Sequence, residues 1–146
     1  MDMFFIIDKE TDEIIFQIEN DFKKGYYAFE ELGKTIDGNA VFRQVIPSIC
    51  HLLYKSESGY KFLEDYIVRD WLTNRQGINL VNIVEGINGI GLVNGNGEFL
   101  TNTYYDSVQS DINIQVATFK GESADLTISC DRRYRQNFGY DEMEIN

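Results

Sequence analysis

The stretch from Val41 to Leu72 constrains the fold more than any other part of the chain. It holds the only proline (Pro47), the only histidine, the only tryptophan and the longest run of apolar residues at helical spacing. Residues three and four apart share one face of a helix, so this spacing predicts two helices in the stretch. A proline inside a helix removes a hydrogen bond and clashes with the preceding turn. We therefore expect a kink, or the start of a new helix, at Pro47.

The second of these helices should begin near Ser58, a residue type suited to capping, and end at about Asn74, before Gly77. A further helix is expected over residues 22–36, where apolar side chains again recur at helical spacing. The sequence thus predicts about three helices in its first half.

Strand signals lie on both sides of this helical region. Met3–Ile7 and Glu13–Glu19 are β-prone runs around a polar turn, which predicts an N-terminal hairpin. The Asn94–Gly97 segment (Asn-Gly-Asn-Gly) is the strongest hairpin turn in the chain, because Asn-Gly adopts positive φ at little cost. Further strands are expected at Ile78–Val84, Ile90–Val93, Glu98–Thr103, Ile112–Phe119 and Ala124–Cys130, with a last strand or an acidic tail after Asp131.

The order of these elements predicts the fold class. We expect one α+β domain over residues 1–146, with an N-terminal hairpin and about three helices packed on an antiparallel β-meander. No internal repeat is found in the sequence.

The charge of the chain restricts its partners. The formal net charge is −11 over 146 residues. Residues 1–37 and 77–146 each carry a net charge of −6, while the segment between them carries +1. Nucleic acids and anionic membranes would be repelled by such a surface, and basic proteins would be attracted to it.

Several patterns resemble catalytic or cofactor signatures but do not satisfy their chemistry. Residues 28–35 match a loose phosphate-loop pattern, yet Glu30 and Glu31 would repel a phosphate. The glycines at 86–97 fit hairpin turns better than a dinucleotide fingerprint. Cys50 and His51 are neighbours and would diverge on a helix. The basic segment Asp131–Arg135 fits ion pairs with this protein's own acids.

The prediction is therefore that the chain is not an enzyme and has no catalytic residues, no cofactor and no metal ligands. A hydrolase that uses an acidic dyad or a divalent metal stays open as an alternative, because any two of the 24 acids could serve. A small-ligand or assembly module, with a homodimer formed through residues 60–72, is the other alternative.

The cysteines and the N-terminus predict the compartment. Cys50 and Cys130 do not make a disulfide framework, no signal-peptide pattern is present, and no apolar run is long enough to span a membrane. We expect a cytoplasmic protein with both thiols free.

Tyrosines beside acids form the candidate binding surface. The chain has nine tyrosines, and tyrosine is typical of recognition surfaces because it offers a large contact area at little entropic cost. An aromatic and acidic surface would suit a basic partner. The candidate partner-binding residues are Glu30, Glu31, Asp37, Tyr104, Tyr105, Asp106, Tyr140, Asp141 and Glu142.

In size, acidity and expected α+β texture, the whole chain resembles the immunity proteins that neutralise polymorphic bacterial toxins, such as those of contact-dependent inhibition systems. The resemblance rests on no shared motif, so it assigns no residue a role. It implies a stoichiometric inhibitor that covers the active or substrate-binding surface of a basic toxin, often a nuclease.

Overall fold

The computed structural model describes residues 3–19, 27–46, 50–102, 104–111, 113, 116–122, 124–129 and 142–144. These residues form thirteen strands in four sheets and contain no helix. The predicted α+β class is therefore wrong, and the described part of the chain is all-β.

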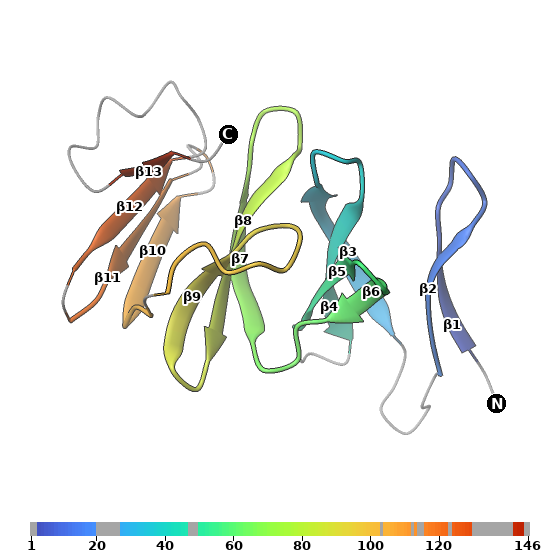
Figure 1. Cartoon of the computed structure of the whole chain (residues 1–146), viewed down its shortest axis with the longest axis horizontal. Helices are drawn as coiled ribbons and strands as arrows, with labels where there is room; N and C mark the ends of the chain where they lie inside the picture. Colours follow the sequence, from blue (N-terminus) through green and yellow to red (C-terminus); the bar gives the residue numbers. More distant parts are fainter. Residues whose placement is uncertain are drawn as a thin grey trace.

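The four sheets follow the sequence order and stand in a row along the long axis of the molecule (Figure 1). Neighbouring strands are antiparallel, except that β12 and β13 are parallel. The first sheet is β1 (Met3–Ile7) and β2 (Ile14–Glu19). The second is β3 (Ala28–Lys34), β4 (Ala40–Ile46), β5 (Leu52–Ser56) and β6 (Gly59–Phe62). The third is β7 (Ile67–Thr73), β8 (Asn79–Gly86) and β9 (Gly89–Val93). The fourth is β10 (Ser107–Asp111), β11 (Val116–Lys120), β12 (Leu126–Ser129) and β13 (Glu142–Glu144).

The third sheet is covered on both faces, because it packs between the second and the fourth. Its central strand β8 is buried from Asn79 to Val84. The cluster between the third and fourth sheets includes Leu72, Ile83, Leu92, Phe119 and Ile128. The cluster between the second and third sheets includes Leu32, Val41, Leu52, Tyr54, Val68, Val84 and Val93.

Aromatic rings join the first sheet to the second. Phe4 of β1 and Phe16 of β2 both contact Phe29 of β3, with ring centroids 5.4 and 6.0 Å apart. Phe16 also meets Phe62 of β6 edge to face at 5.6 Å. These four rings hold the N-terminal hairpin against the second sheet.

Burial on two faces explains why the helix expected across β5 is wrong. β5 lies in the second sheet, and its residues Leu52, Leu53 and Tyr54 are all buried. A strand covered on both faces reads as a continuous apolar run, which cannot be told from a buried helix by periodicity alone. In the described residues, the helix expected over residues 22–36 is β3, the first helix expected after Val41 is β4 and β5, and the helix expected from Ser58 to Asn74 is β6 and β7. The expected kink at Pro47 lies outside the described residues.

The structure confirms part of the strand predictions. β1 and β2 pair as the expected N-terminal hairpin. β8, β9 and β12 lie within about two residues of the expected strands. Three differences remain. β11 begins at Val116, and β10 was not expected. In place of the strand expected over Glu98–Thr103, the described residues 98–102 contribute a single bridge, between Phe99 and Val93.

One turn recurs in the structure although the sequence analysis found no repeat. The Asn94 N–H donates to the Glu98 carbonyl at 2.9 Å, and the Glu98 N–H donates to the Asn94 side chain at 3.0 Å. Asn74–Ile78 repeats both bonds, and Thr35–Asn39 does so with a hydroxyl in place of the amide. In each turn the fourth residue is a glycine with positive φ. The three turns share a side-chain oxygen at the first residue and a glycine at the fourth, and no longer stretch of sequence repeats between them.

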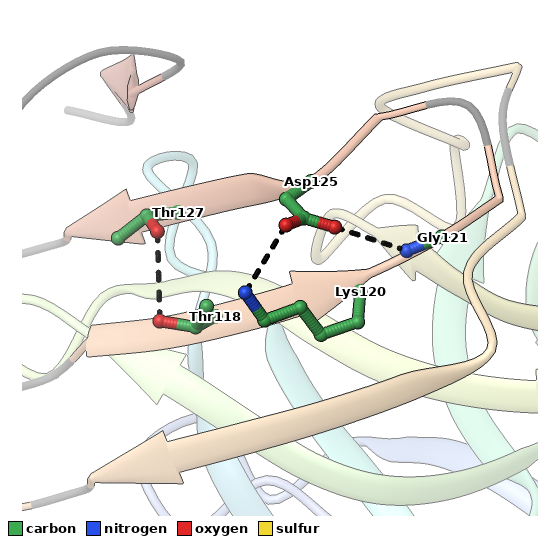
Figure 2. Close-up of polar contacts among 5 residues, drawn as sticks. All are labelled: Thr118, Lys120, Gly121, Asp125 and Thr127. Atoms are coloured by element: carbon green, nitrogen blue, oxygen red, sulfur yellow. Dashed lines mark hydrogen bonds and ion pairs between the residues drawn. The ribbon is translucent and has the colours of Figure 1, made fainter.

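Polar contacts join strands β11 and β12 of the fourth sheet (Figure 2). The Lys120 amine lies 3.1 Å from the Asp125 carboxylate, and the Gly121 N–H donates to the same carboxylate at 3.4 Å. Thr118 faces Thr127 across the strands, 3.5 Å between hydroxyls. The Lys120 contact lowers the pKa of Asp125, with the Gly121 bond as the next cause.

Within the described segments, no helix has the length and apolar character needed to cross a membrane.

Candidate functional site

Three aromatic residues outside the strands meet at the surface of the third sheet: Tyr66 precedes β7, and Phe99 and Tyr104 lie between β9 and β10. Phe99 meets Tyr66 and Tyr104 edge to face, with ring centroids 5.1 and 6.4 Å away. The hydroxyls of Tyr66 and Tyr104 are 2.9 Å apart. Phe99 and Tyr104 keep 38% and 37% of their surface exposed. The three rings form a connected aromatic patch that solvent or a partner can reach.

Glycines beneath the rings explain how they lie so close to the sheet. A Cβ at Gly86 would stand 2.6 Å from the Tyr66 ring, and one at Gly91 would stand 3.1 Å from Phe99. Any larger residue at Gly86 would therefore push the Tyr66 ring away. Because the rings are held by each other and by the sheet, they lose little freedom when a partner binds.

The hydrogen bond between the two tyrosines changes the pKa of Tyr66. Tyr104 is the largest cause that raises the pKa of Tyr66 to about 12, and desolvation and the nearby Asp65 carboxylate add to it. The Tyr66 hydroxyl therefore stays protonated at neutral pH, and the bond holds the two rings together.

A shallow hollow of about 450 Å³ adjoins the patch at Tyr66. Two exposed carboxylates, Glu64 and Asp65, form part of its wall. The remaining lining residues are Tyr54, Lys61, Phe62, Leu63 and Tyr66. Tyr66 belongs to both features, so we call the hollow and the three-ring patch together the Tyr66 surface.

The structure separates the two predicted neighbours Tyr104 and Tyr105. Tyr104 lies in the Tyr66 surface. Tyr105 is 6% exposed and packs against Phe119 in the core, where burial raises its pKa. Asp106 is exposed. Adjacent residues in an extended chain point to opposite sides, and here one side faces the core and the other faces solvent.

The predicted acids of the first half lie elsewhere. Glu30 of β3 forms an ion pair with Arg43 of β4, 2.7 Å between oxygen and nitrogen. Glu31 is exposed on β3. Asp37 lies in the turn after β3 and lines a second hollow of about 370 Å³. None of the three is among the residues that line the hollow at Tyr66.

The predicted C-terminal residues are only partly described. Tyr140 and Asp141 lie outside the described residues. Glu142 begins β13, for which only the strand is described.

Sequence reasoning missed Tyr54, Tyr66 and Phe99 as site residues. Tyr66 was assigned to the apolar stripe of a helix, and Phe99 to a strand. One signal could have found Phe99: it follows a tight Asn-Gly turn and precedes two more aromatic residues at 104 and 105. Nothing local to Tyr66 indicates that it meets Tyr104, which is 38 residues away.

The comparisons and the metal search add no assignment. No protein-family model, curated protein or solved structure matches the chain. In the described ranges, no group of three or more histidine, cysteine, aspartate or glutamate side chains is arranged to hold a metal ion.

Proposed function

We propose that the protein is a stoichiometric inhibitor that binds a basic toxin, a nuclease, and covers its active or substrate-binding surface. The observation that carries the proposal is the Tyr66 surface, in which preorganised aromatic rings lie beside carboxylates. Rigid aromatics dominate the binding energy of many protein interfaces. The net charge of −11 adds long-range attraction for a basic partner.

The proposal needs no chemistry from this chain. An inhibitor of this kind works by occupying a surface that the toxin uses to hold phosphates, so acidic side chains compete with nucleic acid. The proposed compartment is a reducing cytoplasm, and the free thiol of Cys50 is compatible with it.

Co-purification of the tagged protein from its native host tests the proposal. The bound material is washed at stepped salt concentrations and identified by intact mass. We expect one small basic partner at one-to-one stoichiometry, released as salt screens the charges. The partner is then assayed for nuclease activity, which the pure protein should abolish at equimolar concentration.

Two variants locate the interface. Phe99→Ala removes the central ring of the patch and should weaken partner binding by about thirtyfold, as expected for a loss of about 2 kcal/mol at an aromatic hot spot. Ile36→Ala is the matched control, because Ile36 is 78% exposed in the turn after β3 and lies outside the Tyr66 surface. Absence of a partner at every salt concentration contradicts the proposal. Equal effects of the two variants contradict the assigned surface.

A second candidate function is assembly through the N-terminal hairpin. The face of β1 directed away from the second sheet exposes Met3, Phe5 and Ile7, and Ile14 of β2 lies opposite Ile7. Adjoining apolar side chains on an open sheet face favour self-association. Phe5→Ser should convert a dimer to a monomer in light scattering. A wild-type monomer at high concentration argues against this candidate.

A further inference from the structure

Lys61 already places a cation over a tyrosine inside the hollow. Lys61 of β6 pairs directly with Tyr54 of β5, so both side chains lie on one face of the second sheet. The Lys61 ammonium lies 5.9 Å from the centroid of the Tyr54 ring. Gly97 packs so closely on the same ring that a Cβ there would clash with it. The Tyr54 ring, which is only 7% exposed, is therefore covered by a glycine and by a long side chain.

The walls of the hollow are complementary to a positive charge. Among the described residues that line it, Lys61 is the only basic one, and Glu64 and Asp65 are exposed carboxylates. Tyr54 and Tyr66 add ring surfaces. If the flexible Lys61 side chain swings outward, it leaves a hollow that combines aromatic and carboxylate groups, the two partners that a cation prefers.

The same chain shows which cation such an arrangement holds well. The guanidinium of Arg43 lies 4.7 Å from the centroid of the Trp71 ring. Its nitrogens bind the Glu30 carboxylate at 2.7 and 2.9 Å. A planar guanidinium can stack on a ring and bind a carboxylate at the same time, and it is more weakly hydrated than an ammonium.

We infer that the hollow takes an arginine side chain of the basic partner and that Lys61 occupies this place in the free protein. Arginine displaces Lys61 because it can stack and pair at once. This inference rests on the proposed function, since it names the group of the partner that the Tyr66 surface binds.

An NMR titration with a minimal probe tests the inference. The probe is N-acetyl-arginine methylamide, and its uncharged counterpart is N-acetyl-citrulline methylamide. With the arginine probe we expect saturable shifts of the backbone amides of residues 61–66 and of the Tyr54 ring. The citrulline probe has the same shape without the charge and should leave these signals in place.

Lys61→Gln separates displacement from general electrostatics. The variant removes the internal competitor and should tighten arginine binding about two- to fivefold, the range of an exposed cation–π contact. Lys55→Gln is the matched control, because Lys55 is exposed on the adjacent strand and its loss changes the net charge equally. Tyr54→Phe should retain probe binding and Tyr54→Leu should weaken it.

Three results overturn the inference: no saturable shift with arginine, equal shifts with citrulline, or equal gains in Lys61→Gln and Lys55→Gln. The proposed function fails separately. If the wild-type protein captures a basic partner but its hollow does not bind arginine, only the inference fails. If arginine binds the hollow but no partner is captured, the proposed function fails. The assignment of the bound arginine to a basic partner protein then fails as well.

Discussion

Asn79 and Asn82 bind each other through both amide groups inside β8. Each side-chain nitrogen donates to the oxygen of the other at 3.0 Å. Residues three apart in a regular strand point to opposite faces. Here they share one face, because Thr73 pairs with Asn79 while Leu72 pairs with Val81, which leaves Leu80 as an extra residue in the strand. This bulge brings the two amides together.

The first prediction concerns this amide pair. Asn82 is fully buried, and its nitrogen also faces the carbonyls of Val93 and Asn94 at 3.3 Å. Asn82→Ala leaves these buried groups and Asn79 without their partner, so it should lower the free energy of unfolding by about 2–3 kcal/mol. Urea denaturation measures the loss. Asn88→Ala, at an exposed turn, is the control and should change it by less than about 0.5 kcal/mol.

Alanine variants at two glycines in equivalent turns distinguish the cost of backbone strain from the cost of overpacking. Gly38 and Gly97 both have positive φ, but a Cβ would meet open space at Gly38 and the Tyr54 ring at Gly97. Gly38→Ala should cost about 1–2 kcal/mol of stability, from the left-handed backbone alone. Gly97→Ala should cost about 1–3 kcal/mol more because of overpacking. Equal losses in thermal or urea denaturation would contradict the contact between Gly97 and Tyr54.

Tyr104→Phe should lower the pKa of Tyr66 from about 12 toward 10, because it removes the main cause of the shift. A raised pKa in the folded state stabilises the protein below pH 10, and this contribution is lost as the pH rises from 10 to 12. The variant should therefore lose less stability than the wild type in that window. A titration followed by NMR of the tyrosine Cζ carbons measures the pKa. Tyr60 is an internal reference, since burial is the main cause that raises its pKa to about 12.

Lys120→Met should raise the pKa of Asp125 toward its ordinary value of 3.8. The depressed pKa in the folded protein means that the contact contributes above pH 3.8 and is lost as the pH falls below it. NMR titration of the Asp125 carboxyl carbon measures the change. Lys55→Met removes the same charge from a different sheet and should leave this pKa unchanged. An equal response to both variants would mean that net charge, not the contact in Figure 2, sets the pKa.

The parts of the fold that the sequence predicts well are those decided by neighbouring residues. The Asn94–Gly97 turn was expected from its Asn-Gly residues, and the β1–β2 hairpin was expected from two β-prone runs around a polar turn; both are present. In the turn, the Asn94 side chain bonds to nearby backbone N–H groups, and glycine supplies the positive φ. Such bonds form within a few residues, so no distant part of the chain is needed to specify them.

The helix predictions between residues 41 and 74 were wrong for the opposite reason. An apolar run such as Leu52–Tyr54 can belong to a buried helix or to a strand covered on both faces. The choice depends on the sheets that pack on either side. In this stretch, β-branched and aromatic residues such as Ile67, Val68 and Trp71 favour strands, whereas the spacing of the apolar residues favours a helix.

The candidate site, like the fold, has some features that the sequence determines and others that only the tertiary structure decides. Composition by itself determined that the chain is acidic and rich in tyrosine, and both Tyr104 and Tyr105 were placed among the candidate surface residues. Which of the two is exposed, and the meeting of Tyr66 with Phe99 and Tyr104, were decided only by the tertiary structure. Charge and turn chemistry act within a few bonds of a residue, whereas burial and contact depend on which distant strands the packing of the sheets brings together.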